Sequence, residues 1–436
     1  MVLALVFTTA QIGHLLHYPL AVALTCASLG LAVARPALAQ GAGPAADATP
    51  TSAAADATPA GLSEAELKAL AEGAAADASS APAAPATPQA TSSAALSNPA
   101  LSLILDTALA GYSEGKPLLT GGHDPKRNGF NLQQLELHAE SSVDPYLTLQ
   151  ANIVFAQFGV EVEEMYAESL ALPGGLQLKA GQFLNAFGRI NPTHLHSWSF
   201  ADQPLMIGKF FGSEGSRGLG AQLGWLLPLP WYVEIKAAAT DAVGACCARS
   251  LLGGNDLPVR SPADVAYTGN LKTFLPLDED WSLTLSTSGQ AGPNASGNGN
   301  RSEILGGDLY LRYRPVADPE RRHLSLQVEH AVRARQVPGR SLVDHAGYAQ
   351  LVGALALRWE LGVRTEWTTG VAGDPLDPDW TTNRQRHAAQ LTFYPSHFSR
   401  VRVQATLDRP TWRSEPIWGA VVALEALIGA HGSHGF

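Results

Sequence analysis

Apolar and polar residues alternate with a period of two through most of the chain beyond residue 101. One segment places apolar side chains at every second position: Leu147, Leu149, Ala151, Ile153 and Phe155. Comparable segments occupy residues 305–313, 324–328 and 401–407. Successive side chains of a strand point to opposite faces, so each segment predicts a strand with one apolar and one polar face. We count about 16 such segments, each roughly ten residues long.

The connections between these segments alternate between tight turns and, mostly, longer loops. We expect tight turns near residues 144–145, 172–175, 227–230, 276–280, 315–322, 357–358 and 395–397. We expect longer connections over residues 113–129, 188–216, 240–262, 290–302, 335–346, 368–383 and 408–416, and a short one at 158–159. This alternation is typical of an outer-membrane β-barrel, whose short turns face the periplasm.

The chain is therefore predicted to be all-β: a transmembrane antiparallel β-barrel of about 16 strands in the cell outer membrane. An even number of strands places the N- and C-termini together in the periplasm. The alternative is a soluble β-sandwich, in which the apolar faces would meet a second sheet. So regular an alternation of connections makes the sandwich the weaker interpretation.

The chain divides into three parts by composition. Residues 1–39 contain an apolar run followed by Ala37-Leu38-Ala39, which predicts a cleaved signal peptide, with an uncleaved anchor helix as the alternative. Residues 40–97 are mostly Ala, Pro, Thr, Ser and Asp, which predicts a disordered N-terminal segment acting as a periplasmic linker. A capping-box pattern within it predicts a short helix near residues 63–76. The barrel takes residues 98–436.

Composition excludes several other classes of protein. Only 16% of residues are charged, and mean hydropathy is near zero. After the first 40 residues no uninterrupted apolar run reaches the length that a membrane-spanning helix needs. A net charge of −10 argues against a nucleic-acid partner. No nucleophile–base set or cofactor motif can be assembled, so we expect neither an enzyme nor a cofactor; a barrel-embedded esterase or protease is a minor alternative.

Charged residues on the polar faces should enter the lumen if the apolar faces meet lipid. A barrel of about 16 strands is wide enough to leave a water-filled channel. The predicted pore-lining residues are Arg312, Arg314, Arg333, Arg364, Arg384, Arg386, Arg400, Arg402, Asp308, Glu329, Glu360 and Glu366. They could form a transverse field across the pore, or they could simply be Arg–Glu pairs that satisfy a polar interior.

The connection from residue 188 to residue 217 is unusually apolar for an exposed loop. It follows the fifth predicted strand, so it is the third extracellular loop. We predict that residues 190–214 fold into the lumen and form its constriction. The residues assigned to it are His194, His196, Trp198, Phe200, Asp202, Lys209, Phe210 and Phe211. Alternatively, the loop caps the barrel from outside or contacts a neighbouring subunit.

A known family shares one part of this pattern. The run Val162-Glu163-Glu164-Met165-Tyr166, followed by LPGGLQLKAGQFLNAFGRIN, resembles the core of the phosphate-selective porin (O and P) group. The resemblance covers about residues 130–217. It implies a 16-stranded, trimeric, passive channel with its third loop in the pore. Phosphate selectivity does not carry over, because that group uses lysine clusters and this chain is acidic and poor in Lys.

Function is therefore predicted as a porin-type channel for small hydrophilic solutes or ions, with outer-membrane lipid around it and a homotrimer as its expected assembly. The alternative is a metal (zinc)-related outer-membrane receptor or transporter, because His194 and His196 could bind Zn²⁺ with oxygen ligands from Asp202 and Glu214. Hydrogen-bonded packing with Trp198 would equally explain the two histidines. A structural anchor is a third class. Cys246 and Cys247 could form a vicinal disulfide or stay free.

Overall fold

The computed structural model describes residues 99–429, except residues 158, 171, 256, 298 and 379. The predicted signal peptide, the linker and its helix near residues 63–76 lie outside the described residues. None of the described helices is long and apolar enough to cross a membrane.

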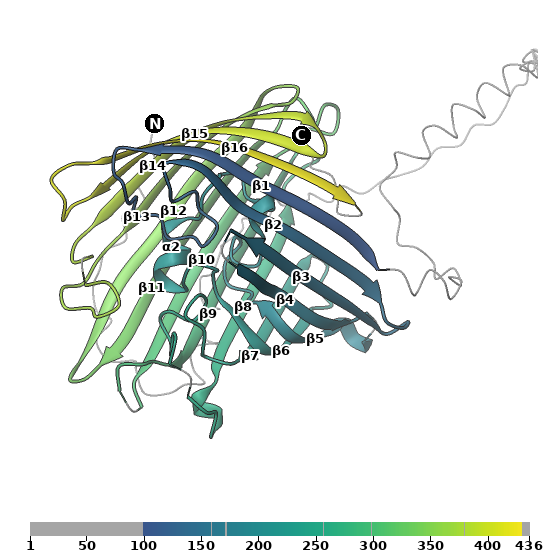
Figure 1. Ribbon diagram of the computed structural model, residues 1–436. Coiled ribbons are helices and arrows are strands. Elements are labelled where there is room, and N and C mark those ends of the chain that lie inside the picture. The colour runs from purple at the N-terminus through teal and green to yellow at the C-terminus, as the bar shows by residue number, and fades with distance from the viewer. Residues whose placement is uncertain are drawn as a thin grey trace, which may run out of the picture. The chain divides into compact units, whose positions relative to one another are not determined.

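Sixteen strands pair in sequence order into one closed antiparallel barrel (Figure 1). The strands are β1 (Ala100–Tyr112), β2 (Gly129–Ser142), β3 (Leu147–Ala156), β4 (Gly159–Ser169), β5 (Leu176–Leu184), β6 (Arg217–Leu226), β7 (Tyr232–Thr240), β8 (Ala266–Pro276), β9 (Trp281–Pro293), β10 (Arg301–Tyr313), β11 (Leu324–Val337), β12 (Arg340–Ala356), β13 (Trp359–Thr368), β14 (Arg384–Ser396), β15 (Ser399–Pro410) and β16 (Ile417–Gly429). The barrel closes where β1 pairs with β16, from Ser102 opposite Gly429 to Tyr112 opposite Gly419. The predicted antiparallel barrel is confirmed.

Each strand presents alternate residues to the two faces of the barrel wall. Large apolar side chains on the outer face are exposed, for example Leu305 at 53% and Val403 at 51%. The intervening positions are polar and buried, as with Arg402 and Glu425 at 0%. Apolar residues therefore cover the outside of the barrel, and charged residues fill the inside.

The connections define two ends of the barrel. At the end that we call the turn end, 143–146, 227–231, 277–280 and 357–358 join successive strands tightly. At the opposite end, the loop end, the long connections are 113–128, 185–216, 241–265 and 369–383.

The expected long connection over residues 335–346 is wrong. β11 and β12 continue through this region and leave only Pro338 and Gly339 between them. Gly339 has a φ of 78°, which suits a glycine in so tight a turn. Arg335 and Asp344 are polar because they point into the barrel, where both are buried, rather than because they belong to a loop.

Candidate functional site

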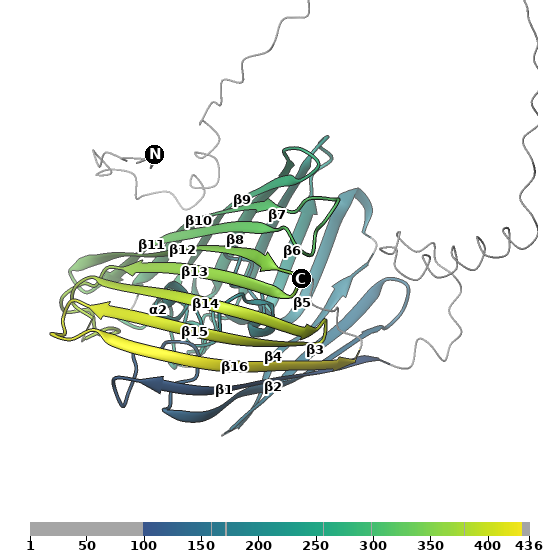
Figure 2. The same ribbon diagram turned by 90° about the horizontal axis from the view of Figure 1, so that it is seen from above.

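The connection between β5 and β6, residues 185–216, lies inside the ring of strands; we call it the inner loop (Figures 1 and 2). It contains the short 3₁₀ helix η3 (Leu195–Ser197) and the short helix α2 (Leu205–Phe210). Its backbone and side chains hydrogen-bond to residues of β9, β11, β13, β14 and β15. The loop therefore crosses the interior rather than capping the barrel.

Large apolar side chains of the inner loop are buried against the inner faces of β10, β11 and β12. The cluster consists of Phe187, Ile190, Met206, Ile207, Phe210 and Phe211 of the loop with Ile304, Ala331, Ala346 and Tyr348 of the wall, and Trp198 packs against it. Phe200 packs separately on Val352 and Ala388. Burial stabilises each large apolar side chain by roughly 1.5–3 kcal/mol, which explains why so apolar a loop leaves the aqueous exterior.

An ionic network fastens the middle of the loop to β13 and β14. Asp202 lies 2.5 Å from the Nη2 atom of Arg364 and 3.3 Å from the Nη1 atom of Arg386. Both arginines also contact Glu366, whose other carboxylate oxygen accepts the backbone N–H of Leu205 at 2.6 Å. Burial opposes ionisation of Asp202, but the two arginines outweigh it and lower the pKa of Asp202 below its usual value.

Two further arginines hold the main chain of the loop near the closing strands. Arg400 donates to the carbonyl of His196 at 2.7 Å, and Arg402 donates to the carbonyl of Phe200 at 3.2 Å. Both arginines lie beside Glu425 of β16. The wall thus supplies guanidinium groups, and the loop supplies backbone oxygens for them.

The helix α2 is anchored through Lys209, whose side chain is fully buried. Its ammonium lies 3.1 Å from Asp344 and 3.4 Å from Asp377, and 4.2 Å from the centre of the Trp380 ring. Asp344 also binds Arg333. These acids lie in β12 and in the connection 369–383, and nothing in the sequence pattern marks them as part of the site.

The remaining predicted pore residues fall into two groups. Glu329 accepts the backbone N–H of Ile190 at 2.9 Å, and Arg384 donates to the carbonyl of Leu118 at 2.6 Å, so both hold connections inside the barrel. Asp308 lies near the middle of β10, where Ser286 donates to it and Arg189 of the inner loop is near enough to affect its charge. Arg312, Arg314 and Glu360 lie toward the turn end, and Glu360 pairs there with His323 and Tyr394. Whether any of these residues lines a conducting path stays a prediction.

Histidines and glutamates gather where the start of the inner loop meets β2 and β4. His194 places Nδ1 2.9 Å from Glu163 Oε2 and Nε2 2.9 Å from Glu164 Oε2. His196 places Nδ1 3.0 Å from Glu136 Oε2. The two imidazoles are stacked, with ring centres 5.7 Å apart. We call these five residues the His–Glu cluster.

A β-bulge explains why two consecutive glutamates take part. The register between β3 and β4 shifts at Asn152 and Ile153, so that Glu163 and Glu164 both point inward and are both 8% exposed. Strict alternation would have turned one of them outward, so the pattern of the sequence gave no sign of it. The expected ligands Asp202 and Glu214 are wrong for this cluster, because Asp202 binds arginines and Glu214 binds His123 at 2.9 Å.

Carboxylates control the charge of the histidines here. Burial disfavours the charged form of His194, but Glu163, Glu164 and Glu136 outweigh it and raise the pKa of His194 well above its usual value. Burial likewise opposes protonation of His123, but the hydrogen bond to Glu214 raises the pKa of His123 to about 9.

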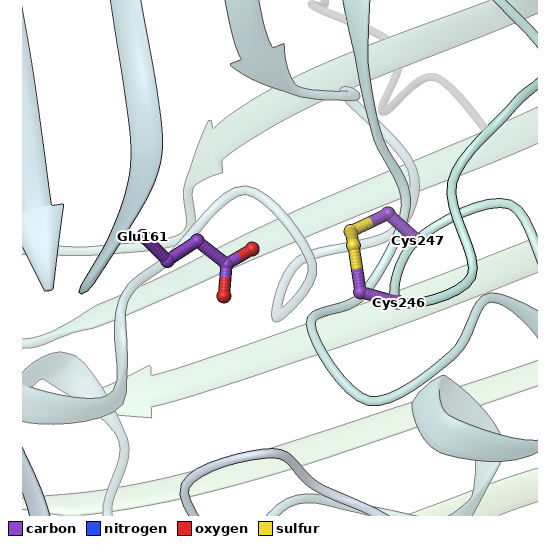
Figure 3. A group of neighbouring side chains, drawn as sticks. All are labelled: Glu161, Cys246 and Cys247. Carbon is purple, nitrogen blue, oxygen red and sulfur yellow. A yellow bond between two sulfur atoms is a disulfide. The ribbon is translucent and has the colours of Figure 1, made fainter. Parts of the chain in front are cut away.

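The return arm of the inner loop lies against the connection 241–265, which contains a disulfide between Cys246 and Cys247 (Figure 3). The carbonyl of Cys246 accepts the backbone N–H of Glu214 at 3.0 Å. Glu161 of β4 points toward the disulfide and forms an ion pair with Arg217. Of the two states expected for these cysteines, the structure has the disulfide.

No known family profile matches this sequence. An uncharacterized protein of Aquifex aeolicus (strain VF5) is 31% identical over 381 residues, which is 78% of this chain and 80% of the relative. The name of this relative does not specify an activity.

Several solved porins and channels share the fold. The outer-membrane channel DcaP of Acinetobacter baumannii gives a TM-score of 0.52 at 10% identity, over 76% of this chain and 97% of that one. An anion-selective porin from Comamonas acidovorans gives 0.51 at 10% identity, over 76% and 99%. OprB of Pseudomonas putida gives 0.50 at 11% identity, over 76% and 94%. The chain therefore has the porin barrel fold. The resemblance to the O and P group stays a prediction, and the metal-receptor alternative gains no support from these proteins.

Proposed function

We propose that this protein, which belongs to one family with the uncharacterized Aquifex aeolicus protein, is an outer-membrane channel for the passive diffusion of small hydrophilic or ionic solutes. The observation that carries the proposal is a closed sheet of sixteen strands with an apolar outer face and a charged inner face. In a bilayer every backbone polar group needs a partner within the protein, and a closed barrel provides one.

Aromatic side chains on the outer face support a position in the membrane. Trp281 packs on Tyr313, and Trp359 packs on Phe393, in each case next to the turn end of the barrel. Rings at one level of a barrel wall are typical of the girdle that meets lipid headgroups. With the turns in the periplasm, the N- and C-termini would be periplasmic and the inner loop would enter from the cell exterior.

The inner loop is proposed as the constriction. It rests against β10 to β16, where the arginines that hold it are nearly inaccessible to solvent. Across the barrel, charged side chains on the inner faces of β5, β7 and β8 keep partial exposure: 17% for Lys179, 24% for Lys236 and 35% for Lys272. We infer that solutes pass between the inner loop and this lysine-bearing wall. A homotrimer is the expected assembly, with outer-membrane lipid around it.

Planar-bilayer conductance of the refolded, purified protein tests the proposal. Wild type should give discrete single-channel steps. Replacing residues 196–212 by a short glycine linker should raise the conductance of each step, because the segment that narrows the lumen is removed. A matched control shortens the connection 411–416, which lies at the same end of the barrel but outside the inner loop.

Assembly has to be checked in every variant by heat-modifiable mobility on gels. An assembled wild-type barrel that gives no steps would reject the channel. An assembled deletion variant with unchanged conductance would leave the channel standing and remove the inner loop from its constriction.

A further inference from the structure

We propose that the His–Glu cluster is a binding site for one divalent transition-metal cation, held by His194 Nδ1, Glu163 Oε2 and Glu136 Oε1. The inference does not depend on conduction, because binding can be measured on a barrel that passes no current. It concerns the place where the start of the inner loop meets the wall formed by β2 and β4.

The three donor atoms already stand close enough to share an ion. His194 Nδ1 is 2.9 Å from Glu163 Oε2 and 3.9 Å from Glu136 Oε1, and each of the three residues places one ligand atom within 4.8 Å of those of the other two. Ligands at about 2.0–2.2 Å from a tetrahedral Zn²⁺ stand roughly 3.3–3.6 Å apart. Rotamer adjustments on the order of 1 Å would therefore bring the donors into coordination.

One of these donors has no hydrogen-bond partner. Glu136 is 1% exposed, and its Oε1 atom accepts no hydrogen bond, although the ring of His194 lies nearby. A buried carboxylate oxygen without a hydrogen bond carries a substantial desolvation cost, and a coordinated cation would remove it. The other oxygen of Glu136 is held by His196, which fixes the direction of Oε1 toward His194.

The second nitrogen of His194 is also arranged as in metal sites. Its Nε2 atom lies 2.9 Å from Glu164 Oε2 and 2.7 Å from Asn152 Nδ2. When the cation displaces the proton from Nδ1, a proton on Nε2 would be donated to Glu164, and the Asn152 amide would turn its oxygen rather than its NH2 group toward the ring. A carboxylate behind a ligating histidine orients the ring and strengthens it as a ligand. The β-bulge supplies both carboxylates from adjacent positions: Glu163 as a ligand of the ion and Glu164 as the group that orients the ring.

The charges and donor types define the class of cation. Three nearly buried carboxylates surround the stacked imidazoles of His194 and His196, and the nearby Arg217 forms its ion pair with Glu161. A divalent cation that displaces the Nδ1 proton of His194 would balance the negative charge that the three carboxylates keep. One imidazole nitrogen with two carboxylate oxygens suits Zn²⁺ and its first-row neighbours better than Mg²⁺ or Ca²⁺, which prefer oxygen ligands alone.

Isothermal titration of the full-length barrel in detergent, after removal of metal with EDTA, tests the site with Zn²⁺ as the probe. All proteins should carry the substitutions His431→Ala and His434→Ala, because these two C-terminal histidines could bind zinc on their own. We expect one saturating Zn²⁺ per chain in this background, and at least tenfold weaker binding of Ca²⁺.

Three substitutions separate the ligands from the positioning residue. Glu136→Gln and His194→Gln should each weaken Zn²⁺ binding by a hundredfold or more, since each removes a donor. Glu164→Gln should weaken it by about 10–100-fold, as for carboxylates that orient a ligating histidine. Glu168→Gln is the matched control on the same strand: it removes a carboxylate that pairs with Lys179, and it should leave the affinity unchanged.

Heat-modifiable mobility identifies variants that fail to assemble, and Glu163→Gln replaces any that does. Absence of saturable Zn²⁺ binding in the assembled protein would overturn the proposal. Equal Zn²⁺ affinity in wild type and in assembled Glu136→Gln and His194→Gln would overturn it as well. None of these outcomes depends on conductance, so the proposed channel function and the proposed cation site are tested independently of each other.

Discussion

Asp202 connects the inner loop to two strands of the barrel wall, β13 and β14, through a single side chain. Its carboxylate contacts Arg364 and Arg386, and all three side chains are nearly inaccessible to solvent. Substituting Asp202→Asn keeps the size of the side chain and removes its charge. Two buried guanidinium groups would then share the remaining carboxylate of Glu366.

The size of the effect follows from burial. Removing one partner of a buried ion pair costs about 3–5 kcal/mol, because the other charge stays buried without compensation. Glu366 keeps contact with both arginines, and the new amide oxygen can still accept a hydrogen bond, so we expect the free energy of unfolding to fall by about 3 kcal/mol. The apolar cluster around Phe210 and Phe211 should keep the loop inside the barrel.

Two measurements check this prediction. The free energy of unfolding, from urea titration of the refolded protein, should fall by the stated amount. Single-channel records should show more frequent transitions between conductance levels, because the loop is held at one point fewer. Asp241→Asn is the control, since Asp241 accepts a backbone N–H from Leu219 and binds no arginine in the contacts described.

The dependence on pH provides an independent check. The pKa of Asp202 is lowered in the folded protein, so its contribution is fully present above the usual aspartate range and is lost as pH falls through the lowered value. Wild type should therefore approach the Asp202→Asn variant only in strong acid. Equal stability and equal gating of the two proteins at neutral pH would refute the reasoning.

Three other predictions concern different parts of the interior. The pKa of His123 is raised to about 9, chiefly by Glu214, so protonation of His123 stabilises the fold by about 3 kcal/mol below the unfolded histidine pKa near 6.5, and this stability is lost as pH rises through about 9. Glu214→Gln should remove most of that dependence from urea titrations at several pH values, and an undiminished dependence would contradict the prediction. Gly212 has a φ of 122°, and a Cβ there would meet the carbonyl of Cys246, so Gly212→Ala should lower the free energy of unfolding by roughly 1–3 kcal/mol more than Gly253→Ala does. Gly253 is the control because its φ is also positive but the space around it is open, and equal effects of the two substitutions would disprove the role of the contact. Replacing Lys179, Lys236 and Lys272 together by Gln should shift the reversal potential in a salt gradient toward cation preference, and an unshifted potential would place the conducting path elsewhere.

The strands could be predicted from the sequence because the residues of each strand alternate between two environments, the lipid outside the barrel and its polar interior. Lipid-facing and interior positions differ in polarity, and the period of two makes the difference visible along segments such as 147–155. The position of the inner loop was also predictable, since Phe200, Phe210 and Phe211 would make an unfavourable exposed patch. The region 335–346 misled, because inward-facing charged residues resemble loop residues where a strand extends beyond its expected end.

Partners inside the barrel could not be predicted in the same way. Arg364 meets Asp202 across 162 positions of sequence, and no periodicity carries such a pairing. The bulge that turns Glu163 and Glu164 to the same side depends on register with β3, which is a property of two strands together. The sequence could therefore indicate that the histidine pair has acidic neighbours, but it identified the wrong ones.

The closing seam between β1 and β16 has a consequence for biogenesis. Ala201 of the inner loop packs there against Ala108, Ala110, Val421 and Ala423, and its N–H is bonded to Gln404 of β15. The inner loop therefore contacts β1 and β16, the first and last strands of the chain, whose pairing closes the barrel. Insertion of the loop and zipping of the seam should then be one concerted event, with protease resistance of residues 196–212 appearing at the same rate as the heat-modifiable form. An open sheet with a protected loop, or a closed barrel with a cleavable one, would not accumulate during assembly.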